Sequence, residues 1–131
     1  MPVVRDQKGQ TAVEFALITP LLITILLGII QMGIAFHNYV TITDAARAGA
    51  RKAIVARFTG GSTATTEQAV RAAASDLNQS KLGVTVTPTT LTTAGSTVTV
   101  TATYPFTIDI PLLGLAVFSG NLTATAKEDL E

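Results

Sequence analysis

The sequence contains no cysteine, so it cannot form disulfide bonds, thiolate metal sites or cysteine nucleophiles. It carries a single histidine, His37, and its acidic and basic residues balance to a formal net charge of zero. This balance implies no general attraction to nucleic acid. His37 stands at the edge of a long apolar run, which favours a role at a membrane interface over a catalytic one.

The motifs of common enzyme classes are missing as well. There is no glycine-rich phosphate loop, no metal-ligand spacing and no nucleophile elbow. Asp109 falls on the polar side of an alternating segment without an evident carboxylate partner. Acidic residues also gather in a tail that is expected to be solvated, at Glu128, Asp129 and Glu131. We therefore predict no enzyme, no cofactor and no metal site; a Ser/Asp/His site assembled only by folding stays open as a remote alternative.

What the sequence does contain is an uncharged run from Phe15 to Phe36. As a helix, its about 22 residues would rise roughly 33 Å, close to the hydrocarbon thickness of a bilayer. A core helix in so small a chain would show a polar face, and a cleaved secretory signal would have a shorter apolar stretch. The run therefore predicts a transmembrane helix over residues 10–38 that stays attached to the chain.

This helix is expected to begin near residue 10 or 11 and to end near Phe58, with residues 39–59 as its soluble continuation. Pro20 lies inside it. Because proline removes a backbone donor and clashes with the preceding turn, it predicts a kink or local unwinding near residues 16–20.

The soluble continuation of the helix carries a stripe of small residues, Ala45, Gly49 and Ala53. Its charged residues fall largely on the other side, namely Asp44, Arg47, Arg51 and Lys52. A small-residue stripe lets another backbone approach closely. Packing inside the domain is favoured here over a contact between subunits.

A second, short amphipathic helix is predicted after the loop that begins at Gly60. Thr65 followed by Gln68 fits a capping box at its start. Gly83 can follow its end. Its predicted apolar face consists of Val70, Ala73, Ala74 and Leu77.

The last third of the chain alternates with a period of two and predicts strands with one buried face and one threonine-covered face. The alternating sets are Val84 and Val86, Val98 to Tyr104, Phe106 to Ile110, and Leu122 to Ala126. Residues 94–96 are predicted to form a turn. Residues 111–120 follow neither period, which leaves open a loop against the helix or an exposed contact patch. The predicted fold class is α+β, a long N-terminal helix packed on a small antiparallel sheet within residues 60–131.

Glu14 opens the apolar run, where an ionised carboxylate costs about 2.5–3.5 kcal/mol at a membrane centre and less near an interface. Taken alone, it is explained as a residue that marks the interface and favours the helix N-terminal dipole. Its surroundings favour a function instead, because a short leader with Arg5 and Lys8 ends at Gly9, just before it.

Longer segments carry a family resemblance. The segments "GQTAVEFALITPLL" and "DAARAGAR" resemble the TadE-like family, and "VTVTATYPF" and "LTATAK" are similar to that family's strands. These proteins are pseudopilins or minor pilins of the tight-adherence (Tad, type IVc) pilus system. The major Flp pilins are little more than the helix, so the soluble domain favours a minor subunit with a pilin-like fold.

The resemblance implies a prepilin leader over residues 1–9, cut by a prepilin peptidase between Gly9 and Gln10. Glu14 would then be the fifth residue of the mature chain, with Phe15 as its neighbour in the motif. It would pair with the N-terminal amine of a neighbouring subunit during assembly. The implied partners are the prepilin peptidase, other pilins, Tad assembly proteins and membrane lipid.

The resemblance also implies a location: the bacterial inner membrane, crossed once, with a cytoplasmic N-terminus and the soluble domain outside or in an extracellular pilus. Positive charges after the membrane segment, at Arg47, Arg51 and Lys52, argue against this orientation, but downstream domains can translocate despite their charge. The alternative function is a single-pass membrane-anchored binding module of the cell envelope that enters no filament.

Overall fold

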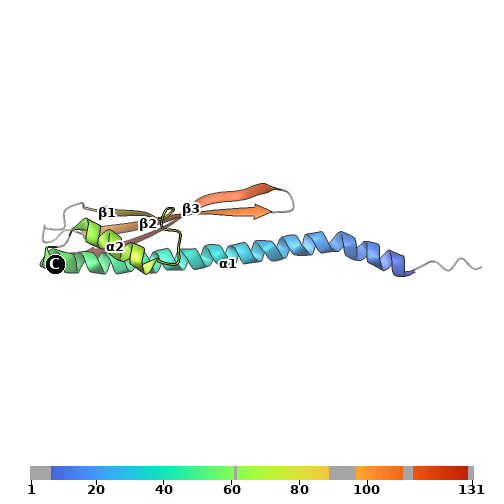
Figure 1. Cartoon of the computed structure of the whole chain (residues 1–131), viewed down its shortest axis with the longest axis horizontal. Helices are drawn as coiled ribbons and strands as arrows, with labels where there is room; N and C mark the ends of the chain where they lie inside the picture. The colour runs from blue at the N-terminus through green and yellow to red at the C-terminus, as the bar shows by residue number, and fades with distance from the viewer. Residues whose placement is uncertain (1–6, 61, 89–96, 111–113, 130–131) are drawn as a thin grey trace, which may run out of the picture.

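The computed structural model describes residues 7–60, 62–88, 97–110 and 114–129. Its elements are helix α1 (Gln7–Thr59), helix α2 (Thr63–Ala73) and strands β1 (Gly83–Thr87), β2 (Thr97–Ile110) and β3 (Leu115–Asp129). The sheet lies along the C-terminal half of α1, and the N-terminal part of the helix extends beyond the other elements (Figure 1). The predicted α+β class, with a long apolar helix and an antiparallel sheet, is confirmed.

Helix α1 is continuous over 53 residues. It already includes Gln7, so the predicted start near residue 10 is wrong; Gln7 and Lys8 are good helix formers that extend a helix established by the apolar run. The observed end, Thr59, lies one residue beyond the predicted one. The helix passes Pro20 without interruption, so no local unwinding occurs there. Figure 1 shows the ribbon curving in its N-terminal third, and a kink at Pro20 itself stays a prediction.

The C-terminal half of α1 supplies the small side chains of the core. Its fully buried residues include Ile42, Ala45, Ala46, Ala50 and Ala53. Gly49 lies among them, and a Cβ added there would overlap Val70 Cγ2 and lie 3.2 Å from Val100 Cγ1. Helix α2 and strand β2 thus both approach α1 closely at this point. The small-residue stripe packs inside the domain, as favoured from the sequence.

The start of α2 differs from the prediction. Ser62 is the N-cap residue, its side chain makes no capping hydrogen bond, and the Thr65 N–H donates to the Ser62 carbonyl at 3.0 Å. The predicted capping box of Thr65 and Gln68 is therefore wrong, because the helix begins at Thr63 and both residues lie within it. A Thr–Gln spacing of three also occurs inside helices, where it caps nothing.

The end of α2 is also earlier than the apolar pattern suggested. The helix ends at Ala73, which is exposed, so this residue does not belong to the apolar face. Val70, Ala74 and Leu77 are buried as predicted, the last two beyond the end of the helix. The apolar side chains after Ala73 reach the core from turns rather than from a fourth helical turn.

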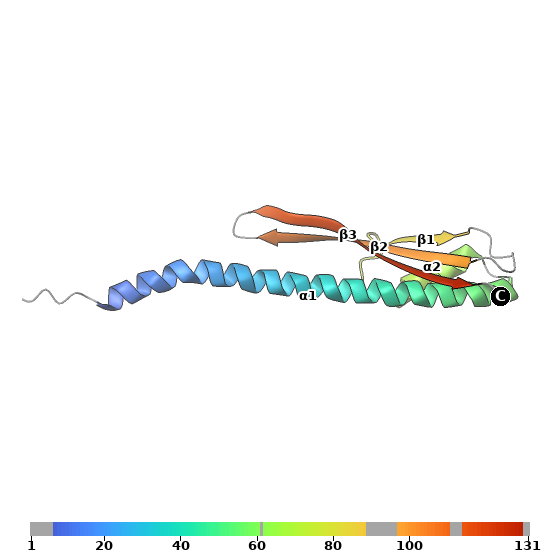
Figure 2. The same cartoon turned by 180° about the vertical axis from the view of Figure 1, so that it is seen from behind.

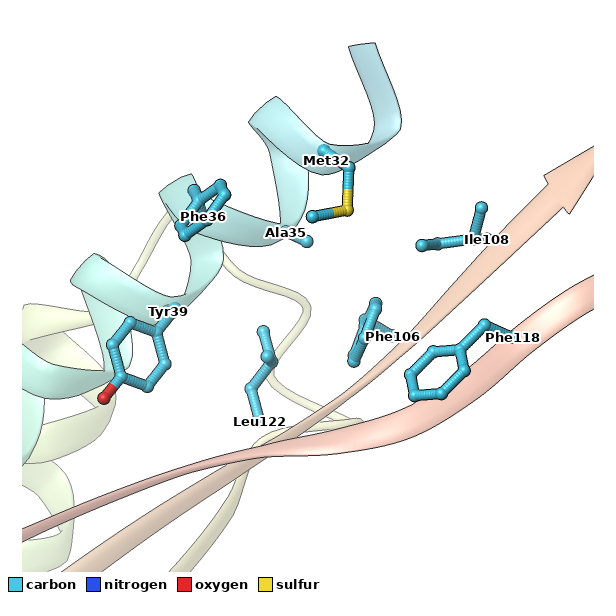
Figure 3. A pocket seen from close by; sticks show the side chains of 8 residues that line it. All are labelled: Met32, Ala35, Phe36, Tyr39, Phe106, Ile108, Phe118 and Leu122. Atoms are coloured by element: carbon cyan, nitrogen blue, oxygen red, sulfur yellow. The ribbon is translucent and has the colours of Figure 1, made fainter. Parts of the chain in front are cut away.

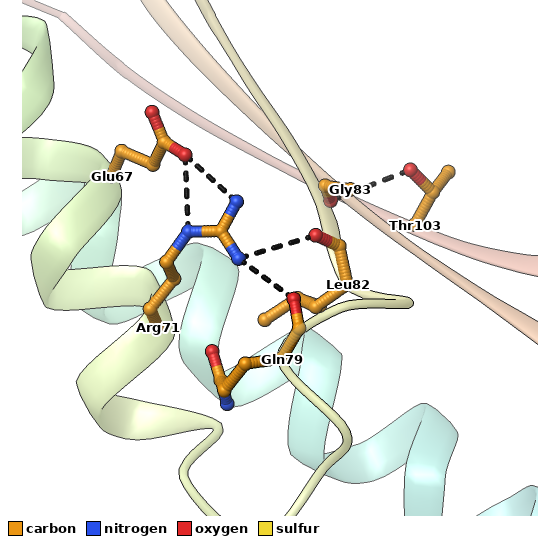
Figure 4. Close-up of polar contacts among 6 residues, drawn as sticks. All are labelled: Glu67, Arg71, Gln79, Leu82, Gly83 and Thr103. Carbon is orange, nitrogen blue, oxygen red and sulfur yellow. Dashed lines mark hydrogen bonds and ion pairs between the residues drawn. The ribbon is translucent and has the colours of Figure 1, made fainter.

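Arg71 connects α2 to the segment that leads into β1 (Figure 4). Its Nε and Nη2 donate to Glu67 Oε1 at 3.0 and 2.8 Å, and its Nη1 donates to the carbonyls of Gln79 and Leu82 at 3.1 and 3.4 Å. The side chains of Arg71 and Glu67 are both more than a third exposed, so the ion pair itself contributes at most about 1 kcal/mol. Its main effect is to fix the loop that delivers β1 to the sheet.

The three strands form an antiparallel sheet in the order β1–β2–β3. Its register brings even-numbered residues together on the face that packs against α1. The paired core residues are Val86, Val100 and Ala126 in one row, and Val84, Ala102 and Ala124 in the next. The alternation read from these three segments is confirmed, with threonines on the opposite face.

Two strand boundaries need correction. The segments predicted as separate strands on either side of Pro105 are one strand, β2. Proline fits there because β1 pairs with β2 no further than Thr103, so that side of Pro105 has no ladder partner among the described strands. Strand β3 begins at Leu115, so residues 115–120 are strand rather than loop. Residues 111–113 and the predicted turn at residues 94–96 lie outside the described residues.

Beyond Thr103, β2 and β3 continue without β1 as a two-stranded hairpin (Figure 2). The far end of this hairpin is attached to α1 through Gln31. The Gln31 Nε2 donates to the Asp109 carbonyl at 2.5 Å, and the Asp109 N–H donates to Gln31 Oε1 at 2.9 Å. The side-chain amide thus pairs with the backbone as a neighbouring strand would, and holds the hairpin beside the apolar part of the helix.

Candidate functional site

The N-terminal half of α1 contains no buried residue from 9 to 33 in the part of the chain that the structure describes, although Gln31, near the end of this half, bonds to the hairpin. None of its most apolar 18-residue window is buried, and Phe15 and Leu17 are 71% and 75% exposed. Leaving such a surface in water is unfavourable by about 25 cal/mol per Å² of apolar area. The helix is long and apolar enough to cross a membrane. Lipid or other helices are the surroundings in which this half is stable.

Glu14 lies on the exposed first turns of this bare half. The Gln10 Nε2 donates to Glu14 Oε1 at 3.2 Å, one helical turn away. Positions four residues apart lie on the same face of a helix, so Gln10 and Glu14 share one face. A carboxylate has room for several hydrogen bonds, and the amide of Gln10 leaves capacity for a further donor.

Gly9 lies within the first turns of α1 rather than in an extended segment before the helix. Among the described residues, a Cβ added at Gly9 would meet nothing within 4 Å, so no packing there requires a glycine. Glycine does lower helix stability by about 1 kcal/mol relative to alanine, which makes local opening easier at this position. The structure gives the residue no role in the fold.

Pro20 lies further along the bare half, where threonine hydroxyls bond to the backbone of the same helix. Thr19 Oγ1 donates to the Phe15 carbonyl at 2.7 Å, and Thr24 Oγ1 donates to the Pro20 carbonyl at 2.8 Å. Such bonds satisfy polar groups within the helix, as an apolar environment demands. They are compatible with a membrane-spanning helix that contains a proline.

His37 pairs with an acidic residue rather than standing alone. Its Nε2 lies 3.0 Å from Asp76 Oδ2, and the two side chains are 67% and 49% exposed. The pair joins α1 to the segment after α2, just beyond the apolar run. Among the described residues, no group of three or more histidine, aspartate and glutamate side chains could hold a metal ion.

The structure thus brings Gly9, Gln10, Glu14 and Phe15 together on the first turns of one exposed helix, with Pro20 further along the same helix. Within the described residues, no hydrogen bond or ion pair links these five positions to another element. Sequence reasoning missed the contact between Gln31 and Asp109. The sequence did offer a clue to this contact, because Gln31 is the one amide side chain in the uncharged run.

Comparison with known proteins gives a match to a protein family. The model of the family described as TadE-like protein matches residues 9–51, which is 43 of the 131 residues. The match begins at Gly9 and ends with the "DAARAGAR" segment, so it confirms the resemblance carried by the two N-terminal segments. The two strand segments lie outside the matched residues. No curated protein matches the chain, and no solved structure does.

The TadE-like family is a family of pilus components rather than of enzymes. The match and the apolar N-terminal helix together fit a membrane-anchored protein associated with a Tad pilus.

Proposed function

Because residues 9–51 match the TadE-like family, we propose that this protein is a membrane-anchored minor pilin or pseudopilin that takes part in assembling a Tad pilus. The observation that carries the proposal is the family match over the N-terminal helix, and the division of α1 into two halves supports the membrane anchor. The C-terminal half is buried in its own domain, and the N-terminal half is bare. In this proposal the bilayer covers the bare half before assembly, and the helices of other pilins cover it afterwards.

We propose that maturation occurs by cleavage between Gly9 and Gln10 in the cytoplasmic leaflet of the bacterial inner membrane, with the soluble domain on the far side. The exposure of this part of α1 supports access by a prepilin peptidase. Because Gly9 is helical, the peptidase would have to open the first turns of α1 before cutting. The low helix stability at glycine favours such opening.

The role proposed for Glu14 is to accept the new N-terminal ammonium of a neighbouring subunit. In a single chain the carboxylate is exposed, and an exposed ion pair contributes little. In a packed bundle of helices, water is excluded and an unpaired carboxylate becomes strongly unfavourable. Pairing between subunits would then fix their register, while folding of the soluble domain would not depend on Glu14.

The test of maturation is the intact mass of the chain recovered from cells that carry the prepilin peptidase. Wild type is expected to lack residues 1–9, and Gly9→Val is expected to remain full length because its branched side chain does not fit a cleft shaped for a small residue. The matched control is Gly9→Ala, which keeps the residue small and should still be cut. A Gly9→Val chain that begins at Gln10 would show that the cleavage site is assigned wrongly.

The same measurement addresses the second candidate, an anchored binding module of the cell envelope. That candidate predicts a wild-type chain with Met1 intact in the presence of the peptidase. The exposed N-terminal half of α1 fits both the pilin and the anchored binding module. The family match favours the pilin.

A further inference from the structure

An apolar groove lies between α1 and the β2–β3 hairpin (Figure 3). Met32, Phe36 and Tyr39 line it from the helix, and Phe106, Ile108 and Phe118 line it from the strands. Its volume is about 480 Å³, within the range of pockets that bind small apolar molecules. Phe36 and Phe118 remain 64% and 56% exposed, so the groove is open.

The groove continues the apolar surface of the membrane-spanning segment. At about 1.5 Å per residue, Met32 lies roughly 26 Å along the helix from Phe15, and Phe36 roughly 32 Å. The hydrocarbon of a bilayer is about 30 Å thick. The helix wall of the groove therefore stands at the boundary between hydrocarbon and headgroups, on the side of the soluble domain. Tyr39, one turn further, lies where tyrosines are enriched at membrane surfaces.

The hairpin has one apolar face and one polar face, which suits the boundary between hydrocarbon and headgroups. Phe106, Ile108 and Phe118 face the groove, and the rings of Phe106 and Phe118 contact each other with centroids 5.6 Å apart. The alternate positions are polar and exposed, at Thr107, Asp109 and Ser119. A hairpin with one apolar and one polar face belongs at an interface between hydrocarbon and water.

Gln31 fixes how far the hairpin reaches toward the membrane. Its amide holds Asp109 beside the helix near the C-terminal end of the apolar run. Both polar groups of the amide are satisfied by this contact, which matters where water is scarce. The exposed carboxylate of Asp109 keeps this position near the headgroups.

We propose that the groove holds an acyl chain of a lipid from the leaflet nearest the soluble domain. The hairpin then acts as a second membrane contact beside the transmembrane helix, with its apolar face on the acyl chain and its polar face among headgroups. The inference rests on α1 spanning the membrane and is independent of entry into a pilus.

The absence of tryptophan from the sequence permits a direct test. Phe118→Trp places a single fluorophore in the groove, and the full-length protein is reconstituted into phosphatidylcholine vesicles whose acyl chains carry bromine. Bromine near the carbonyl end of the chain should quench this tryptophan more strongly than bromine near the methyl end. Phe106→Trp, on the facing strand, should behave in the same way and serves if the first variant fails to fold.

Two controls make the result specific. Thr107→Trp lies on the other face of the hairpin at the same level; it should be quenched less by brominated chains and more by acrylamide in the water. Ile25→Trp lies about 15 Å from Phe15, near the middle of the bilayer, and should be quenched most by bromine near the methyl end. Quenching at Ile25→Trp establishes insertion whether or not the groove holds lipid.

The groove proposal is overturned if Phe118→Trp is quenched no more than Thr107→Trp while Ile25→Trp is quenched. It is also overturned if quenching of Phe118→Trp by lipid disappears as the protein density in the vesicles rises, because a second copy of the chain would then be the occupant. If brominated lipid quenches Phe118→Trp at all protein densities, the result supports lipid as the occupant of the groove.

Discussion

The close approach at Gly49 predicts a measurable effect of one methyl group. A Cβ at this position overlaps Val70 Cγ2 and lies 3.2 Å from Val100 Cγ1, and both valines are fully buried. Overpacking a core costs about 1–3 kcal/mol. The better helix propensity of alanine offsets about 1 kcal/mol of this. Because two stiff β-branched side chains oppose the new methyl, Gly49→Ala should lower the free energy of unfolding by about 1–2 kcal/mol.

A double-mutant cycle with Val70→Ala isolates this contact. Val70→Ala alone should cost about 2–3 kcal/mol through lost burial and the cavity left behind. When Gly49→Ala is added, the new methyl fills part of the space vacated by Val70 Cγ2, so the double variant should be no less stable than Val70→Ala. The expected coupling is favourable, about 1–3 kcal/mol.

The measurement is urea unfolding of residues 39–131, followed by circular dichroism. Additive losses, within about 0.5 kcal/mol, would refute the packing argument. They would mean that α1 and α2 are further apart than the structure places them.

Two further predictions concern the same soluble part. Residues 39–131 should fold as a monomer with a mixed helix and sheet spectrum, because the core lies between the C-terminal half of α1, α2 and the sheet; a disordered spectrum would mean that the sheet needs the membrane or a partner. Thr66 is fully buried, and its hydroxyl has no hydrogen-bond partner among the described residues, so Thr66→Val should raise the free energy of unfolding by about 1 kcal/mol. Thr101→Val, on the threonine face of the sheet, is the control and should change stability by less than about 0.5 kcal/mol.

The sequence predicted the elements whose pattern follows a single physical rule. An apolar run long enough to span a membrane predicted the first half of α1, and alternation with a period of two predicted the core face of the sheet. The predicted boundaries of helices and strands were wrong where two rules compete. The alternation predicts separate strands before and after Pro105, yet Pro105 fits within β2 because β1 does not extend that far. The capping box at Thr65 failed because the same residue spacing also occurs within a helix.

The candidate site was predictable as a set of residues but not as a geometry. Gly9, Gln10 and Glu14 were found through the motif, while the hydrogen bond between Gln10 and Glu14 depends on the helix having already formed at Gln7. The groove beside Phe118 could not be predicted, since no local pattern says that the hairpin extends along the membrane segment. The contact that places it, between Gln31 and Asp109, joins positions 78 residues apart.

The central claim is that the charge of Glu14 serves assembly. Glu14→Gln keeps the size of the side chain and removes its charge; Asp44→Asn makes the same change on the exposed soluble part of α1, where Asp44 pairs only weakly with Arg47 at 3.5 Å. The measurement is the recovery of each variant, relative to wild type, with sheared filaments or with co-purified Tad components. Glu14→Gln should be inserted and cut after Gly9 yet be lost from this fraction, and Asp44→Asn should be recovered like wild type. Equal recovery of Glu14→Gln and wild type would contradict charge pairing between subunits, and a failure of Glu14→Gln at the cleavage step would assign the carboxylate to recognition by the peptidase instead.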